Sequence, residues 1–180
     1  MKRINSRIAF IIATLVLVAS MALASPPTGQ RASLERVRKE LVTLPYYGVF
    51  DNLEYQVEGS TVTLYGQVVK PLTRQDAERR VAKIEGVDHV VNNIEVLPLS
   101  GFDDSIRARA YRTIFRTGSL YRYAMGANPS IHIIVARGHV TLEGVVANRG
   151  DAQRAYIAAR TVPGSFSVTN HLRIEEAGRL

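Results

Sequence analysis

The chain has 180 residues, with 23 Lys and Arg against 16 Asp and Glu, a formal net charge of +7 and no cysteine. This length allows one ordinary domain or two small ones. The lack of cysteine excludes disulfides, thiolate zinc sites, iron–sulfur clusters and a cysteine nucleophile. Hydrophobic residues make up 46% and charged residues 22%, proportions typical of a globular protein rather than a disordered one.

The first 24 residues have the composition of an export signal. Lys2, Arg3 and Arg7 precede an apolar run at 8–19, and Ala22-Leu23-Ala24 has the small-residue spacing of a cleavage site. We predict cleavage after Ala24 and a periplasmic protein. An uncleaved inner-membrane anchor is the alternative, although the apolar run is shorter than the roughly 20 residues of a stable span. The mature chain keeps 20 basic and 16 acidic residues, a net charge of +4, and export argues against nucleic acid as a partner.

An internal repeat with an offset of 78 residues follows. Val62-Thr63-Leu64-Tyr65-Gly66 aligns with Val140-Thr141-Leu142-Glu143-Gly144, and Gly86 aligns with Gly164 without a gap. Two copies are too few for a solenoid, which needs about three repeats. The repeat therefore predicts two tandem domains at 33–98 and 102–176, with a flexible N-terminus at 25–32, a linker at 99–101 and a tail at 177–180.

Each copy shows the same order of hydrophobic patterns. In the first copy a helical pattern at 34–44 precedes alternating strand patterns at 53–57 and 62–68, a helix that begins at Thr73 as N-cap, and a strand at 89–96. A right-handed crossover makes the third strand parallel to the second. We therefore predict an α+β fold of two αββαβ domains, each a three-stranded mixed sheet with two helices on one face.

The second copy has its own variants of these elements. Asp103 or Asp104 is expected to cap its first helix, and Asp151 takes the place of Thr73 at the start of the second. Strands are expected at 131–136, 139–146 and 167–174.

Several of these segments resemble the BON (bacterial OsmY and nodulation) domain. The resembling segments are 138–146 (GHVTLEGVV), 162–164 (VPG) and 168–172 (VTNHL) in the second copy, and 62–66 (VTLYG), 86–87 (GV) and 90–94 (VVNNI) in the first. The resemblance implies an envelope module without catalytic activity that binds phospholipid or attaches to other envelope components. The glycines of the motif are interpreted as turn and helix-end residues: Gly66, Gly86, Gly138, Gly144 and Gly164.

No residue pattern predicts chemistry. The chain has no nucleophile elbow, P-loop, dinucleotide fingerprint or HExxH motif, and its four histidines are scattered. Asp103 and Asp104 are adjacent, so on a helix their side chains point in different directions. We therefore predict no enzymatic activity, no cofactor and no metal.

Charge is distributed unevenly between the two copies. Residues 31–98 hold 9 basic and 10 acidic residues, whereas the chain from Asp103 onward holds 11 arginines and 6 acidic residues. Arginine forks bidentately onto phosphate, and tyrosine favours the membrane interface. The candidate lipid-binding residues are Arg109, Arg112 and Arg116, spaced on one helix face, with Tyr121, Arg122 and Tyr123 after them.

An ordinary solvated face, with tyrosines packed between the domains, is the competing interpretation. The aromatic stretch Tyr46, Tyr47 and Phe50 of the first copy is interpreted as packing rather than as a ligand platform. The functional hypothesis is a periplasmic module that associates with anionic phospholipid membranes and supports envelope integrity or stress tolerance. The alternative is an adaptor that docks to another envelope protein without lipid. The sequence leaves the oligomeric state open.

Overall fold

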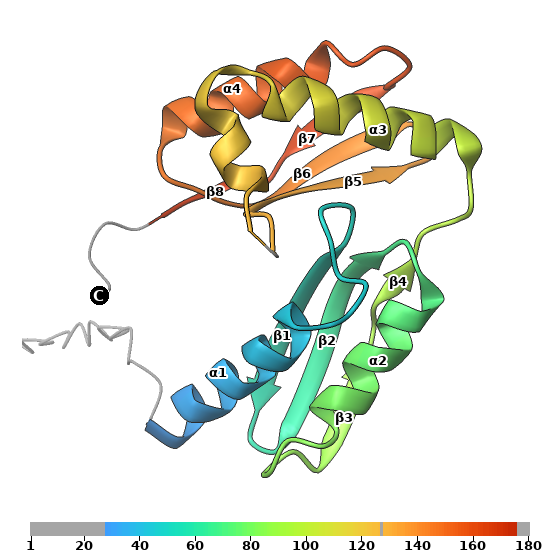
Figure 1. Ribbon diagram of the computed structural model, residues 1–180. Coiled ribbons are helices and arrows are strands. Elements are labelled where there is room, and N and C mark those ends of the chain that lie inside the picture. The colour runs from blue at the N-terminus through green and yellow to red at the C-terminus, as the bar shows by residue number, and fades with distance from the viewer. Residues whose placement is uncertain (1–27, 127, 176–180) are drawn as a thin grey trace, which may run out of the picture.

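The computed structural model describes residues 28–126 and 128–175, with side chains from Ser33 onward. The predicted export signal at 1–24 and the tail at 177–180 lie outside the described residues. Two αββαβ units stand one above the other in Figure 1. Each unit has its own buried apolar cluster, so the prediction of an α+β fold with two similar units is confirmed.

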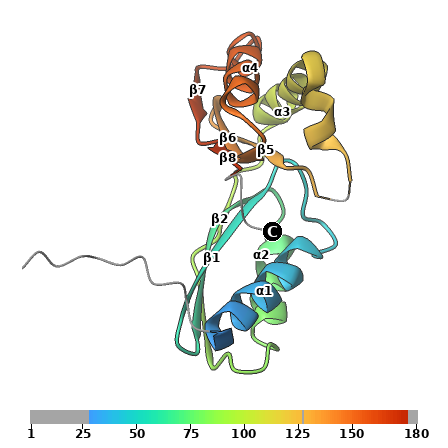
Figure 2. The same ribbon diagram turned by 90° about the vertical axis from the view of Figure 1, so that its left-hand side faces the viewer.

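Domain 1 consists of α1 (Thr28–Val42), β1 (Asn52–Glu58), β2 (Thr61–Val68), α2 (Pro71–Val81), β3 (His89–Asn92) and β4 (Glu95–Val96). Strand β1 runs antiparallel to β2, while β3 and β4 both run parallel to β2. The buried side of α1, Val37 and Leu41, belongs to the same core as Val62 and Leu64 of β2. Figure 2 shows both helices on one side of this sheet.

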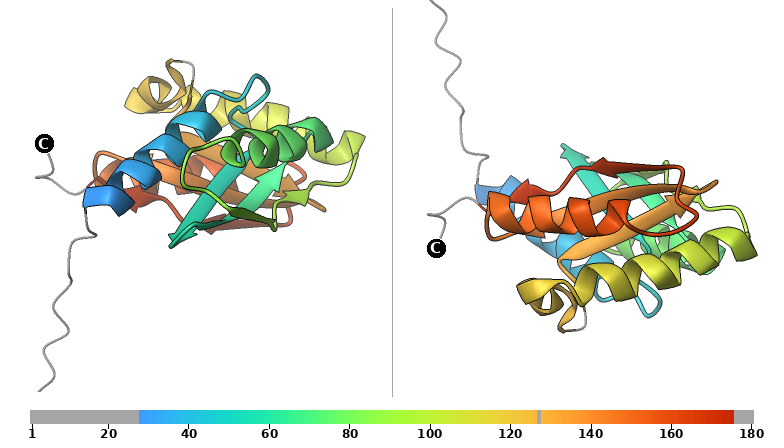
Figure 3. Two further views of the ribbon diagram at one scale, coloured as in Figure 1. Left: turned by 90° about the horizontal axis from the view of Figure 1, so that it is seen from below. Right: turned by 90° about the horizontal axis from the view of Figure 1, so that it is seen from above.

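Domain 2 repeats this topology with α3 (Gly101–Phe115), a short 3-10 helix η1 (Gly118–Ala124), β5 (Ile131–Ala136), β6 (His139–Val146), α4 (Arg149–Arg160), β7 (Ser167–Asn170) and β8 (Arg173–Ile174). Strand β5 is antiparallel to β6, and β7 and β8 are parallel to it. Helices α3 and α4 lie over the sheet on the side turned away from domain 1 (Figures 1 and 3).

The third strand of each sheet is broken, where the sequence predicts a continuous strand. In domain 1 the Asn92 side-chain oxygen accepts a hydrogen bond from the Ile94 N–H at 3.2 Å, and in domain 2 Asn170 accepts from the Leu172 N–H at 3.1 Å. The asparagine side chain takes a backbone donor from the strand, which interrupts the ladder. The repeated asparagine thus explains the break in both copies.

Helix starts differ from the predicted ones. Helix α2 begins at Pro71, a residue type suited to the first helical position, so the prediction of Thr73 as N-cap is wrong. Ser100, not an aspartate, caps α3, its hydroxyl accepting from the Asp103 N–H at 3.2 Å. Asn148 caps α4, accepting from the Asp151 N–H at 2.9 Å. Helix α1 begins at Thr28, inside the segment predicted to be flexible.

Asp103 holds the β5–β6 turn instead of capping a helix. Its carboxylate is almost fully buried and accepts hydrogen bonds from the N–H groups of Arg137, at 2.9 Å, and Gly138, at 2.7 Å. Arg137 has a φ of 52°, a left-handed conformation that is uncommon for a residue with a side chain. The two hydrogen bonds from Asp103 stabilise that turn.

Gly66 and Gly144 occupy equivalent points where two backbones approach closely. Their φ angles are 110° and 113°, and a Cβ atom would lie 2.1 Å from the Asn52 carbonyl oxygen or 2.0 Å from that of Ser130. No side chain fits at either point. Glycine at these two points therefore allows the two strands of each hairpin to lie close together.

A loop of domain 1 joins the two domains. The Val49 carbonyl accepts a hydrogen bond from the Ile133 N–H of edge strand β5 at 2.7 Å, and Val49 and Phe50 pack against the core of domain 2. The Phe50 ring stands edge-on to the Tyr111 ring of α3, with centroids 6.3 Å apart. The Asp51 carboxylate shapes the loop by accepting from the Gly48 N–H at 3.0 Å and from the Val69 N–H at 2.7 Å.

His132 of β5 completes this interface. Its Nδ1 lies 3.2 Å from the Gly48 carbonyl and its Nε2 lies 3.4 Å from the Tyr47 hydroxyl. Burial raises the pKa of Tyr47 to about 12, so its hydroxyl keeps its proton and donates to Nε2. Burial also lowers the pKa of His132, because a charged ring would lose its hydration. The packing interpretation is therefore confirmed for Tyr47 and Phe50, whereas Tyr46 remains about half exposed beneath the Lys70 ammonium.

We predict that Gly144→Ala destabilises domain 2 by about 2 kcal/mol or more, because the new Cβ must displace the Ser130 carbonyl and adopt a disfavoured φ. Urea unfolding would measure this. Gly101→Ala is the control, since a Cβ there meets nothing within 4 Å. Equal unfolding midpoints for the two variants would contradict the close-approach argument.

We predict that the domains separate more readily as the pH falls below about 6.5. When the two domains are in contact, burial lowers the pKa of His132. When they are apart, the ring is solvated and takes up a proton at a higher pH. Protonation therefore favours the separated form, and the domain contact becomes weaker as the pH falls toward the lowered pKa. Small-angle scattering from pH 7.5 to 5 would show the molecule lengthening. His132→Gln should remove the pH dependence, and the control His139→Gln, at an exposed position, should keep it.

Candidate functional site

The helical layer of domain 2 carries the positive surplus of that domain. The segments 101–116, 118–124 and 149–160 together contain eight arginines and three aspartates. Two of the three aspartates, Asp103 and Asp151, are buried. This helical layer faces away from domain 1 (Figures 1 and 3), and of its arginines Arg107 is buried beneath the layer.

Three of the predicted lipid-binding residues lie together on this layer. Arg109 and Arg112 of α3 and Arg116, its C-cap, line a shallow hollow of about 260 Å³, which Thr113 and Pro163 complete. The Arg109 Nε donates to the Pro163 carbonyl at 3.1 Å, which fixes its guanidinium beside the turn after α4. Arg112 and Arg116 are exposed, and neither forms an ion pair with any carboxylate in the described residues. We call these three residues the arginine stripe.

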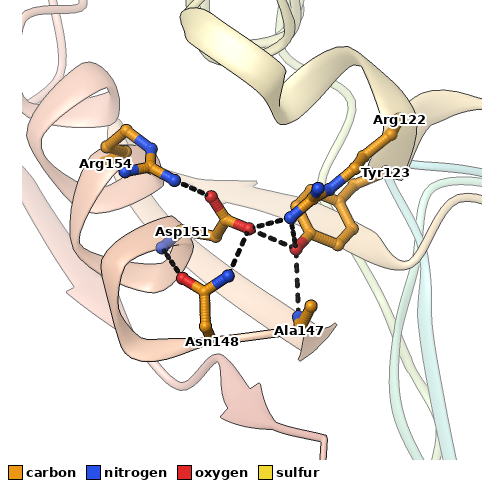
Figure 4. Close-up of polar contacts among 6 residues, drawn as sticks. All are labelled: Arg122, Tyr123, Ala147, Asn148, Asp151 and Arg154. Atoms are coloured by element: carbon orange, nitrogen blue, oxygen red, sulfur yellow. Dashed lines mark hydrogen bonds and ion pairs between the residues drawn. The ribbon is translucent and has the colours of Figure 1, made fainter.

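Arg122 and Tyr123 take part in a different arrangement (Figure 4). The Tyr123 hydroxyl donates to the Asp151 carboxylate at 2.6 Å and accepts from the Ala147 N–H at 3.0 Å. Arg122 and Arg154 form ion pairs with the two oxygens of the same carboxylate. Tyr123 is 7% exposed, so its ring is not available to a lipid headgroup, and we replace the interfacial role predicted for it by a structural one.

The Asp151 cluster fastens η1 to the first turn of α4. The Tyr123 hydrogen bond, followed by the charges of Arg154 and Arg122, lowers the pKa of the Asp151 carboxyl. Asp151 also lies in the first helical turn, where a negative charge favours the helix dipole. The cluster therefore positions η1, and with it Tyr121, relative to the arginine stripe.

Exposed aromatic side chains flank both ends of the arginine stripe. Tyr121 is 59% exposed near the C-terminal end of α3. Near its N-terminal end Phe102 and Phe166 pair, with centroids 5.8 Å apart, and Phe166 is 70% exposed. No sequence pattern singled out this phenylalanine pair. The repeat offered a signal for it: at the offset of 78, Phe166 aligns with the charged Asp88. An aromatic residue at a position that is polar in the first copy indicates a surface feature specific to the second.

The described residues contain no cluster of potential metal ligands. Among residues 28–126 and 128–175 no group of three His, Asp or Glu side chains could hold a metal ion. The His171–Glu143 pair lies in the open on the sheet, with 2.7 Å between Nδ1 and Oε1. In the same part of the chain, none of the helices is both long and apolar enough to cross a bilayer.

A comparison with protein-family models decides the family. The BON domain model matches residues 35–98 and again residues 103–176. The chain belongs to the BON domain family. BON domains occur in periplasmic and envelope proteins, take part in binding there and are typically non-catalytic.

Other comparisons add little to the BON assignment. No curated protein sequence gives a significant match. Among solved structures, CdsD, a structural protein of the type III secretion system of Chlamydia trachomatis, is 9% identical over 80% of this chain and 92% of its own, with a TM-score of 0.33. Its C-terminal domain is 10% identical over 79% of this chain and 97% of its own, with a TM-score of 0.32.

We predict that domain 2 loses stability in acid through Asp151. The pKa of Asp151 is lower in the folded than in the unfolded state. Its contribution to the free energy of unfolding is therefore complete above the unfolded pKa of about 4, and it is lost as the pH falls through the lower pKa of the folded state. Urea midpoints measured between pH 6 and pH 2.5 should decline less steeply for Asp151→Asn than for the natural protein. Glu175→Gln is the control, because that carboxylate is exposed and forms no ion pair with the described residues. An unchanged slope in Asp151→Asn would contradict the assignment.

Proposed function

We propose that the protein is a non-catalytic periplasmic module that binds anionic phospholipid membrane surfaces through the helical layer of domain 2 and so supports envelope integrity under stress. The observation that carries this proposal is the arginine stripe, in which Arg112 and Arg116 are exposed and Arg109 half-exposed, none of them ion-paired with a described carboxylate, between exposed aromatic rings. Arg109, Arg112, Arg116 and Tyr121 form the core of the binding surface. Phe102 and Phe166 extend it beyond the residues suggested by the sequence.

Electrostatic attraction provides the first part of the binding free energy. A basic residue near an anionic membrane surface contributes about 1 kcal/mol, so the arginine stripe contributes about 3 kcal/mol. That amount alone gives weak, salt-sensitive association. Guanidinium groups are suited to this role because they pair bidentately with phosphate oxygens.

Apolar contact provides the second part. Phe166 is 70% exposed and Tyr121 is 59% exposed, at opposite ends of α3. Aromatic side chains of this kind favour the headgroup region of a bilayer, where an apolar ring and a polar edge are both accommodated. Burial of a largely exposed phenylalanine contributes about 1–2 kcal/mol that does not depend on salt.

The arrangement of the domains allows this surface to meet a flat membrane. Helices α3 and α4 lie on the far side of the domain 2 sheet from domain 1 (Figure 3). Domain 1 therefore does not stand between the arginine stripe and a membrane. Its own helical charges are partly paired, as in the ion pair between Arg80 and Glu40 at 3.5 Å.

We predict that replacing Arg109, Arg112 and Arg116 by alanine lowers affinity for vesicles containing phosphatidylglycerol by about 100-fold, the equivalent of about 3 kcal/mol. Co-sedimentation would measure it, and raising salt from about 50 to about 500 mM should weaken the natural protein in the same direction. The matched control removes three positive charges from domain 1 through Lys39→Ala, Arg74→Ala and Lys83→Ala. Equal affinity of the two triple variants would overturn the assignment of the surface.

We also predict that Phe166→Ala lowers vesicle affinity by roughly tenfold at both low and high salt, because it removes apolar contact and no charge. The control is Leu72→Ala on α2 of domain 1, an exposed aliphatic residue outside the proposed surface. A loss that disappears at high salt would mean that Phe166 acts only by orienting Arg109. An unchanged affinity would remove the phenylalanine pair from the proposed surface.

A further inference from the structure

A groove in domain 1 runs between α1 and the edge strand β1. It has a volume of about 440 Å³, and its described lining comes mainly from one side of α1 and the first half of β1, with Arg173 of domain 2 at the rim. Strand β1 lies at the edge of its sheet, with β2 as its only strand neighbour among the described strands. The groove walls and floor include Leu34, Arg38, Leu41, Val42, Leu53 and Tyr55.

The same place in domain 2 is occupied by a segment of the chain. There a turn of the domain 1 loop meets edge strand β5 at one point, with the Val49 carbonyl accepting from the Ile133 N–H at 2.7 Å. The next residue, Phe50, lies beside the Tyr111 ring of α3. The molecule therefore contains one example of how the sheet edge of a BON domain receives another segment: a turn that supplies one backbone hydrogen bond to the edge strand and a side chain against the first helix.

The two grooves correspond residue by residue. Tyr55 pairs with Leu64 in β2 as Ile133 pairs with Leu142 in β6, at the same offset of 78. This shared register directs the Tyr55 N–H away from β2, toward the sheet edge, as it directs the Ile133 N–H toward Val49.

The helices correspond as well. Val42 and Phe115 are the last residues of α1 and α3, so Arg38 stands where Tyr111 stands in domain 2. In domain 2 the neighbouring wall is aromatic and meets a phenylalanine. In domain 1 it combines the aliphatic Leu34 and Val42 with a guanidinium, which selects a different side chain on the incoming segment.

The charge of the groove lining indicates the charge of the segment that would bind there. Arg38 of α1 and Arg173 of β8 both line the groove, are exposed and form no ion pair with a described carboxylate. Glu54 provides the single negative charge among the described residues of the lining. An acidic side chain on the incoming segment would therefore meet two guanidinium groups at the rim, where such pairs set specificity and orientation.

We propose that the groove between α1 and β1 of domain 1 is a docking site for an extended, acidic peptide segment of another protein. The segment adds to the β1 edge through backbone hydrogen bonds, places an apolar side chain against Leu34 and Val42, and sets a carboxylate beside Arg38 and Arg173. Strand addition of this kind draws affinity from the main chain and specificity from side-chain pockets. This site is separate from the arginine stripe and does not depend on membrane binding.

The probe for this site is a synthetic peptide with the sequence of residues 45–52, PYYGVFDN, because that segment fills the equivalent groove and carries an aspartate. It would be titrated into the isotope-labelled mature protein and followed by amide chemical shifts. We expect saturable shifts at 34–42 and 53–57, with a dissociation constant of about 1 mM. Shifts confined to β5 and α3 would mean that the peptide only competes with the loop of the protein itself, and would overturn the proposal.

Charge reversal at the rim tests specificity. Arg38→Glu should weaken peptide binding at least tenfold, whereas Lys39→Glu, an exposed residue next to it that does not line the groove, should leave it unchanged. Circular dichroism and the vesicle affinity of both variants should match the natural protein, because neither position belongs to the arginine stripe. Equal peptide affinity in the two variants, or loss of vesicle binding together with peptide binding in Arg38→Glu, would overturn the proposal.

Discussion

The hydrogen bond between the Ile133 N–H and the Val49 carbonyl is the contact on which the arrangement of this molecule depends. Strand β5 lies at the edge of its sheet, and an uncovered edge offers unpaired backbone groups to other chains. The domain 1 loop covers part of that edge, and Phe50 closes the side next to α3. The Asp51 carboxylate accepts hydrogen bonds from the backbone N–H groups of Gly48 and Val69. Because all three residues belong to domain 1, the docking segment is shaped within domain 1. One short loop thereby turns two small cores into a single assembly with the domain 2 helices outermost.

The two domains use one fold for different surfaces. In both, the buried stripe of the first helix packs on the sheet, as Val37 and Leu41 do in domain 1 and Ala110 and Ile114 do in domain 2. The helical positions that face solvent are free to vary, whereas buried polar positions such as Asp103 and Asp151 are fixed by their hydrogen bonds. In domain 1 they hold partly paired charges, whereas in domain 2 they hold the arginine stripe. Binding properties can therefore diverge between copies while the topology is unchanged.

The sequence predicts the topology well because both signals for it, the hydrophobic periodicity and the internal repeat, can be recognised without knowing any tertiary contact. Period-two and helical patterns locate the elements, and the offset of 78 residues repeats them, so the hairpin and the parallel third strand are confirmed in each domain. The sites are predicted less completely because they depend on tertiary contacts. Tyr121 and Tyr123 look alike in sequence, yet only Tyr123 reaches the buried Asp151. Likewise Thr73 suits a helix cap by type, but Pro71 ahead of it already starts the helix.

The proposed membrane surface and the proposed peptide groove can be used at the same time. The arginine stripe lies on the outer helices of domain 2, whereas the groove lies between α1 and β1, beneath the domain 2 sheet in the view of Figure 1. A membrane that contacts α3 and α4 therefore leaves α1 and β1 uncovered. Arg173, on the last described strand of domain 2, reaches the rim of the domain 1 groove, so the groove depends on the same docking of the two domains that directs the arginine stripe outward. The contact between Val49 and Ile133 consequently sets the geometry of both surfaces, and a change that separates the domains should alter peptide binding and membrane orientation together.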